Sequence, residues 1–231
     1  MHSSCLLEIA VASVERAQAG ERAGAHRLEL CADLAVGGLT PDIELIRGVR
    51  SSVALPIHVL VRPRAGNFAY NPAEFAQMKE EIQAIRAEKV QGIATGVLLP
   101  DGSVDTQRTR ELVALASPMQ VTFHRAFDET RDLAAALEAI VLAGAHRVLT
   151  SGGAADAHSG ASVLRSLIQR GGNRIAILPG GSLHPGNIAE VARATGAREI
   201  HTGLGAVIPY ASENIAAFES AVRNCLARLQ G

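Results

Sequence analysis

Eight short apolar runs alternate with amphipathic stretches along the whole chain. The runs read LLEIAVAS, HRLELCAD, PIHVLVRP, GIATGVLL, QVTFHRAFD, HRVLTSGG, RIAILPGG and EIHTGL. The stretches between them have helical spacing. Four glycines stand just before the next run, where C-terminal helix caps are expected: Gly24, Gly144, Gly171 and Gly196. Repeated strand–helix alternation predicts a parallel sheet with helices packed on it.

The number and size of these units distinguish between two α/β architectures. Eight units of about 29 residues match the size of a closed (β/α)8 barrel. The alternative, an open doubly wound sheet, would have a glycine-rich dinucleotide turn after its first strand, and IAVASVERA has none. No linker, charge run or low-complexity segment divides the chain. We therefore predict an α/β fold, a single TIM-barrel domain over residues 1–231, with an additional C-terminal helix, NIAAFESAVRNCLARL.

Composition and charge narrow the class of protein without naming a function. The chain is 48% hydrophobic but only 3% aromatic, which indicates an aliphatic core of the kind that fits helices on a parallel sheet. Lysine plus arginine number 22 against 23 acidic residues, so the basic excess typical of nucleic-acid or membrane-surface binders is missing. No stretch approaches the roughly 20 apolar residues of a membrane span, and the N-terminus lacks a cationic leader. We expect a soluble cytoplasmic protein that binds neither nucleic acid nor membrane.

Polar side chains recur on one face of the predicted strands. Because side chains alternate along a strand, the uniformly apolar face packs against the helices and the other points into the barrel. In VTFHRAFD, residues 121–128, His124 then points inward near the top, Phe123 packs outward, and Arg125 and Asp128 lie on the departing loop. The same sorting gives the expected inward set of Glu8, Glu29, Cys31, Arg62, Arg64, His124 and His201, with Asp128 at the rim.

This inward set has two interpretations. Glutamates and histidines that face arginines could supply acid–base catalysis on an anionic substrate, because burial raises the pKa of a carboxyl group and a nearby arginine lowers it. The candidate catalytic residues are then Glu8, Glu29, His124, Asp128 and His201. The alternative is a structural network, in which the two glutamates pair with Arg62 and Arg64 inside a polar barrel.

Glycine-rich loops after the sixth and seventh predicted strands indicate an anion site. The segment LPGGSLHPGNI places Gly180 and Gly181 after the seventh strand and before a helix near Asn187, which is the layout of a barrel phosphate site. The TSGG segment after the sixth strand is similar. The candidate substrate-binding residues are Arg62, Arg64, Arg125, Ser151, Gly180 and Gly181.

The cysteines give one candidate metal ligand. Cys5, Cys31 and Cys225 are widely separated, and no C-x-x-C pair exists. Cu(I) prefers thiolate and thioether ligands. Only Cys31 has an inward position near a strand top, where it forms a weak site if His124 or His201 converges on it.

Several segments resemble those of one known family. HRLELCADLAVGGLTPD, VLVRPRAGNFAYN, GVLLPDGSVD, VTFHRAFDE, RVLTSGG and ILPGGSLHPGNI are similar to the signature segments of the CutC family, in the same order. The resemblance implies a TIM barrel that forms homodimers or higher oligomers, is cytoplasmic, and binds or handles copper as Cu(I). It also implies a polar cluster of Glu8, Glu29, Arg62, His124, Asp128 and His201, and it makes Cys31 a candidate copper contact.

The chain departs from the family pattern at two places. Where many relatives have an arginine shortly after the position of His201, this chain continues with Thr202, Gly203 and Leu204. A glycine common in the loop after the seventh strand is replaced by Ser182. An anion site that uses this arginine in relatives would lack it in this chain.

Three hypotheses follow from the sequence. The first is a copper-binding protein in copper homeostasis, as the resemblance implies. The second is an isomerase or lyase whose small phosphorylated or carboxylated substrate is held by Arg62 and the Gly180–Gly181 loop, with His124 and a glutamate as acid and base. The third is a scaffold barrel with a structural polar interior. The sequence does not decide whether the chain is an enzyme.

Overall fold

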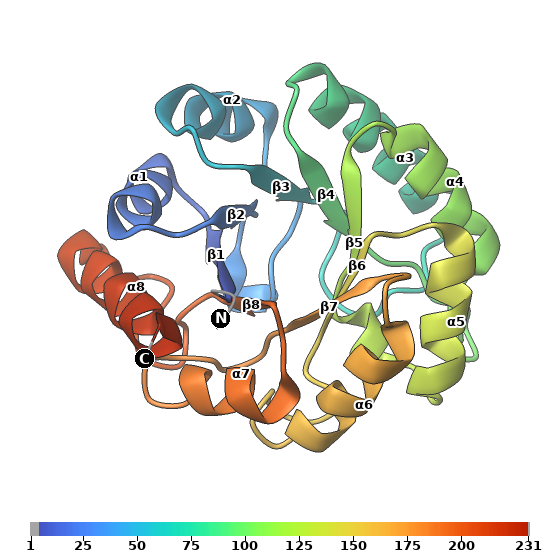
Figure 1. The fold of residues 1–231 in the computed structure, drawn as a ribbon. Helices are drawn as coiled ribbons and strands as arrows, with labels where there is room; N and C mark the ends of the chain where they lie inside the picture. The colour runs from blue at the N-terminus through green and yellow to red at the C-terminus, as the bar shows by residue number, and fades with distance from the viewer. Residues whose placement is uncertain (1–4, 231) are drawn as a thin grey trace.

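Eight parallel strands form a nearly closed barrel in the computed structural model, which describes residues 5–230 (Figure 1). The strands are β1 (Leu6–Val11), β2 (Arg27–Leu30), β3 (Ile57–Leu60), β4 (Gly92–Thr95), β5 (Gln120–Phe123), β6 (Arg147–Thr150), β7 (Ala176–Pro179) and β8 (Glu199–Thr202). Neighbours pair in the order β7-β6-β5-β4-β3-β2-β1-β8. At the seam, β7 and β8 contact each other, although no ladder joins them within the described residues. The predicted (β/α)8 barrel is confirmed.

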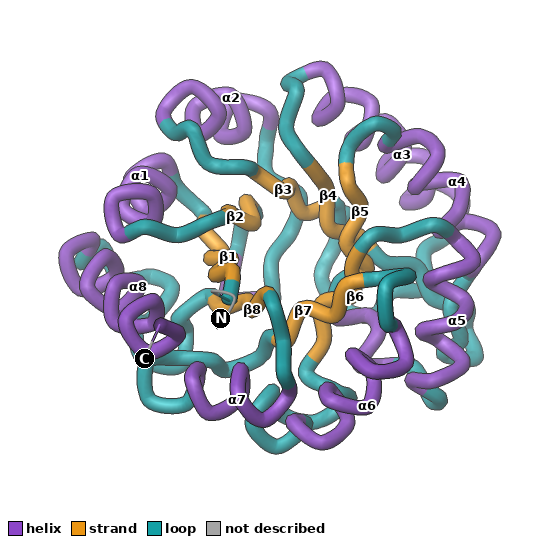
Figure 2. Tube along the Cα trace, in the orientation of Figure 1, coloured by secondary structure: helices purple, strands orange, loops and turns teal. Residues whose placement is uncertain are grey.

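Eight helices surround the strands (Figure 2). They are α1 (Val14–Ala23), α2 (Ile43–Ser52), α3 (Pro72–Ala87), α4 (Thr106–Ala116), α5 (Leu133–Ala143), α6 (Ala161–Gly171), α7 (Ile188–Thr195) and α8 (Ile215–Gln230). The predicted C-terminal helix is α8, which packs against α1 and α7 and completes the ring. No helix among the described residues is long and apolar enough to cross a membrane.

Left-handed glycines end the helices as the sequence predicts, with one correction. Gly24, Gly144 and Gly196 are C-caps with φ of +94°, +88° and +73°, a region where a side chain would be strained. The expected cap at Gly171 is wrong by one residue. Gly171 is the last residue of α6, and Gly172 follows as the cap with φ +55°.

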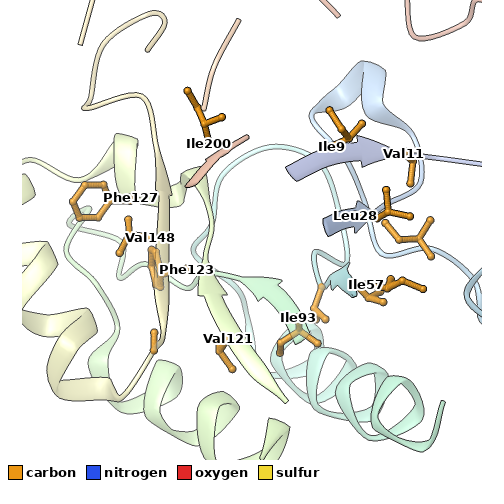
Figure 3. Packing of buried hydrophobic residues seen from close by; sticks show 14 of the residues in the cluster. Ile9, Val11, Leu28, Ile57, Ile93, Val121, Phe123, Phe127, Val148 and Ile200 are labelled. Atoms are coloured by element: carbon orange, nitrogen blue, oxygen red, sulfur yellow. The ribbon is translucent and has the colours of Figure 1, made fainter. Parts of the chain in front are cut away.

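The hydrophobic core lies between the strands and the helix ring. The strand residues that face outward, such as Ile9, Leu28 and Phe123, are fully buried there (Figure 3). Burying each such side chain contributes roughly 1.5–3 kcal/mol. The apolar face of the strand pattern is therefore the helix-facing one, as predicted.

The barrel lumen is polar instead. Glu8 of β1 pairs in register with Arg27 of β2 on one side and with His201 of β8 on the other. Lower in the barrel, Glu199 accepts hydrogen bonds from both Arg27 and Arg147. TIM-barrel interiors are usually filled by branched aliphatic residues, so this charged lumen is a specific feature of the chain.

Candidate functional site

A cavity of about 240 Å³ opens at the C-terminal ends of the strands, where TIM-barrel sites are found. Most strands and their loops contribute to its wall. Six of the sequence-predicted site residues line it: Glu29, Arg62, His124, Arg125, Gly181 and His201. Leu34, Gly37, Leu60, Phe68, Leu149, Ser182, Gly203 and Tyr210 also line it, with Ala10 of β1.

His201 stands between two glutamates. Its Nδ1 lies 2.8 Å from Glu8 Oε1, and its Nε2 lies 3.8 Å from Glu29 Oε2. Burial alone would lower the pKa of His201, but the charges of Glu29 and Glu8 and the hydrogen bond to Glu8 raise it. Glu8 therefore fixes the ring, and Nε2 is turned toward Glu29.

The two glutamates have opposite pKa shifts. Burial alone would raise the pKa of Glu8, but the hydrogen bond from His201 and the charge of Arg27 bring it well below its usual range. Burial raises the pKa of Glu29 to about 6, and Glu8 adds to this rise. No hydrogen bond reaches the Glu29 carboxylate from any described residue. Two carboxyl groups with separated pKa values are the arrangement that acid–base chemistry uses.

His124 is a neutral ring at the end of β5. Its Nδ1 accepts a hydrogen bond of 3.2 Å from the backbone N–H of Ala126, so the proton of the neutral ring is on Nε2. Burial and the charge of Arg62 lower the pKa of His124 to about 3. A Cβ at Gly96 would lie 2.7 Å from Nδ1, so the glycine makes room for the ring. Nε2 is buried and has no partner in the described chain.

Arg62 joins the loops after β2 and β3 beside the cavity. Its guanidinium donates to the carbonyl oxygens of Val36, Gly38 and Gly66 and stacks on Phe68 at 5.0 Å. No carboxylate pairs with it among the described residues, and it is only 7% exposed. A buried arginine without a carboxylate partner gives the cavity wall an uncompensated positive charge.

Arg64 does not point into the barrel as expected. Its Nε lies 2.6 Å from Glu74 Oε1 at the start of α3, outside the cavity wall. The reason is local, because β3 ends at Leu60 and Pro63 cannot continue a strand ladder. The alternation of side chains therefore stops before Arg64.

Asp128 is enclosed by the loop after β6. Its carboxylate accepts from the hydroxyl of Thr150 and the backbone N–H groups of Ser151 and Gly153, and it pairs with Arg125 at 2.9 Å. The Ser151 hydroxyl donates to Ala154 and accepts from Arg125. Asp128 and Ser151 thus order this loop and orient Arg125 toward the cavity, and their predicted catalytic and binding roles stay predictions.

The comparisons with known proteins agree with one another. The model of the CutC family matches residues 5–206. The chain belongs to the CutC family. It is 42% identical to the family protein CutC of Chromobacterium violaceum over 85% of this chain and 79% of that relative. It is 44% identical to that of Mesorhizobium japonicum over 85% of this chain and 76% of the relative.

Among solved structures, CutC of Streptococcus agalactiae carries a name that assigns it provisionally to copper homeostasis. It is 27% identical, with a TM-score of 0.82 over 86% of this chain and 98% of that one. A structure named native KDPGal, 16% identical with a TM-score of 0.66, covers all of this chain and 96% of its own length and shows the same fold alone.

Cys31, the copper contact implied by the CutC resemblance, is not part of the group of donors that converge in the lumen. It packs on Leu60 and Ala94, is 1% exposed, and has its Sγ 3.7 Å from the carbonyl oxygen of Val11. Burial, with a contribution from Glu29, raises the pKa of the Cys31 thiol well above its usual value. Within residues 5–230, the group of three donors that could hold a metal ion consists of Glu8, Glu29 and His201, without Cys31.

The sequence interpretation of this CutC chain missed three residues at the site. Arg27, which pairs with Glu8, is two positions before Glu29 on the same strand, so the alternation rule applied to it as well. Phe68 and Tyr210 lie in loops, where no periodic pattern indicates which side chains reach a cavity.

Gly180, a predicted substrate-binding residue, does not line the cavity. A Cβ at this position would lie 2.6 Å from Leu149 Cδ1, so Gly180 packs behind the residues that line it.

Proposed function

We propose that this CutC family member acts in copper homeostasis by binding a copper ion in the barrel lumen, between His201 and Glu29. Family membership supports the link to copper, because the name of the Streptococcus agalactiae relative carries that role. We further propose that it acts in the cytoplasm as a homodimer or higher oligomer, as the resemblance implies.

One observation carries the proposal: three buried side chains that can ligate a metal lie close together. Glu8, Glu29 and His201 each offer a ligand atom, and these atoms lie within 4.8 Å of one another. The 3.8 Å between His201 Nε2 and Glu29 Oε2 is too long for a hydrogen bond. It suits two ligands of one ion, because metal–nitrogen and metal–oxygen bonds are each about 2.0–2.2 Å.

The remaining glutamate supports the histidine instead of the ion. Glu8 holds Nδ1 of His201 at 2.8 Å, which leaves Nε2 free to bind, and ligating histidines commonly have such a carboxylate behind them. Arg27 pairs with the other oxygen of Glu8 and balances its charge. Glu8 therefore orients His201, and Glu29 supplies the carboxylate ligand.

The chemistry of the donors favours one oxidation state. Imidazole and carboxylate suit Cu(II), whereas Cu(I) prefers thiolate. Cys31 is protonated at neutral pH because burial raises the pKa of its thiol. We therefore expect the lumen to bind Cu(II) more tightly than Cu(I), and a Cu(I) site at Cys31 stays the alternative.

A competition titration tests the proposal. Purified protein, Glu29→Gln and Cys31→Ser are titrated with Cu(II), and under reduction with Cu(I), against chelators of known affinity. We expect stoichiometric Cu(II) binding that weakens at least about 10–100-fold in Glu29→Gln, since even the loss of a residue that only supports a ligand has an effect of this size. We expect Cys31→Ser to leave Cu(II) binding unchanged.

A surface histidine provides the control for this titration. His158 is half-exposed and pairs only with Glu190, so His158→Gln removes one imidazole without touching the lumen. Equal Cu(II) affinity in wild type and Glu29→Gln would contradict the lumen site. If Cys31→Ser abolishes Cu(I) binding, the copper site would be assigned to the thiol of Cys31.

A further inference from the structure

Three residues that line the cavity from the loops after β7 and β8 have backbone N–H groups that the copper proposal does not use. The N–H groups of Gly181, Ser182 and Gly203 belong to residues that line the cavity, and no described residue accepts from them. Gly181 has φ +117° and Ser182 φ +53°, so the loop after β7 departs from extended backbone at both positions. Successive backbone N–H groups in such turns form concave sites for anions.

Positive charge lines the same cavity from the loops after β3 and β5. Arg62 is buried with no carboxylate partner in the described chain, and its Nε has no hydrogen-bond partner. Arg125 adds a second guanidinium, although Asp128 pairs with it at 2.9 Å. Among the lining residues Glu29 is the only carboxylate, and Nε2 of His201 lies 3.8 Å from its Oε2. The charges around the cavity therefore favour a negatively charged ligand.

His124 provides an independent sign of a missing acceptor. Its ring is part of the wall and is 5% exposed, yet Nε2 has no partner within residues 5–230. Because Nδ1 accepts from Ala126, Nε2 carries the proton and can only donate. Buried donors are normally satisfied, so an unpaired one beside a cavity points to a ligand.

We propose that this cavity binds a small metabolite through a phosphate group, held by the N–H groups of Gly181, Ser182 and Gly203, the charge of Arg62 and the Nε2 proton of His124. Several convergent donors suit the three terminal oxygens of a phosphate monoester. The cavity volume of about 240 Å³ is below the roughly 300–1,000 Å³ of drug-sized pockets, so the molecule is small.

The His124 side chain allows a matched pair of variants. In His124→Asn the side-chain oxygen replaces Nδ1 and keeps the bond from Ala126, but the Nε2 donor is lost. In His124→Gln the amide nitrogen replaces Nε2 and keeps the donor, but the bond from Ala126 is lost. A structural role of His124 affects stability in both variants, whereas a ligand contact affects affinity in the first alone.

The experiment uses chelator-treated full-length protein, titrated by calorimetry with inorganic phosphate, glycerol 3-phosphate and, as the carboxylate comparison, acetate. We expect the phosphate compounds to bind, with affinity about tenfold or more weaker in His124→Asn and near wild type in His124→Gln, as for a hydrogen bond to a charged group. Thermal unfolding of each variant shows that it is folded.

Arg62 and Arg64 give a second matched comparison on one loop. Arg62→Gln removes the buried charge beside the cavity, whereas Arg64→Gln removes a charge that pairs with Glu74 outside it. We expect phosphate affinity to fall only in the first. If Arg62→Gln does not fold, the two His124 variants still decide the question.

Three outcomes would overturn the proposal. These are the absence of phosphate binding by wild type, equal affinity in wild type and His124→Asn, and binding of acetate without phosphate, which would assign the cavity to carboxylates. None of these outcomes depends on copper. The experiment uses metal-free protein, and the substituted residues, His124 and Arg62, are not the proposed copper ligands. Failure of the copper proposal is therefore distinguishable from failure of this one.

Discussion

Glu8 and Glu29 are the same residue type on adjacent strands, yet their surroundings separate their chemistry. Glu8 is held ionised by His201 and Arg27, whereas Glu29 has no hydrogen bond from a described residue and burial raises its pKa to about 6. The hydrogen bond from His201 and the pairing with Arg27 thus distinguish the carboxyl group that keeps its charge from the one whose pKa is raised. The functional difference between the two positions comes from their neighbours.

The raised pKa of Glu29 makes folding stability depend on pH. Between about pH 4.5 and 6 the folded state binds more protons at Glu29 than the unfolded state, so this residue's contribution to stability falls as pH rises through that window. The loss is on the order of 2 kcal/mol at neutral pH. Urea unfolding of wild type and Glu29→Gln from pH 4 to 8 should show the variant gaining relative stability with rising pH. A stability difference that does not change with pH would contradict this shift.

At the scale of single elements, the sequence predicts most of the framework and part of the site. Strand–helix alternation indicates every strand, and alternation within strands places Glu29, His124 and His201 on the inner face, where the structure has them. The rule fails where a strand ends early, as at Arg64. The rule does not apply to loops, so it predicts neither the position of Tyr210 at the cavity nor the enclosure of Asp128.

The loop after β6 gives a test at this scale. Asp128→Ala leaves the N–H groups of Ser151 and Gly153 and the hydroxyl of Thr150 without their acceptor. We expect a loss of about 2–4 kcal/mol in the free energy of unfolding, since the groups of Thr150 and Ser151 are buried and each unsatisfied buried group costs about 1–3 kcal/mol, whereas the exposed Gly153 N–H can bond to water. Asp128→Asn keeps one oxygen and should lose less.

Hydrogen exchange locates the effect of Asp128. Amides of residues 150–154 should exchange faster in Asp128→Ala, while those of β1 and β2 on the other side of the barrel stay protected. Unchanged exchange in this loop would show that the carboxylate does not order it.

At the scale of the whole molecule, ion pairs help to close the barrel at the seam between β7 and β8. No ladder joins β7 to β8 within the described chain, but Glu199 of β8 bonds Arg27 of β2 at 2.7 Å and Arg147 of β6 at 2.9 Å. These two contacts link strands on both sides of the seam. Ion pairs therefore supply part of the closure that backbone hydrogen bonds supply elsewhere.

Glu199→Gln should weaken this closure strongly. It leaves two largely buried guanidinium groups short of a counter-charge, and breaking such a network costs about 3–5 kcal/mol. Glu219→Gln is the matched control, because Glu219 pairs with Arg22 and Arg223 on the surface and should cost less than about 1 kcal/mol. Equal midpoints of urea unfolding for the two variants would mean that the seam does not depend on Glu199.

The polar lumen is one unbroken row of contacts. It runs from His201 through Glu8, Arg27, Glu199 and Arg147 to the side chain of Gln120. Each member hydrogen-bonds or pairs with the next, so a change of charge at one member alters the electrostatic environment of its neighbours. The row connects the C-terminal ends of the strands with their N-terminal ends, so we expect an ion bound beside His201 to change the electrostatic potential near Gln120.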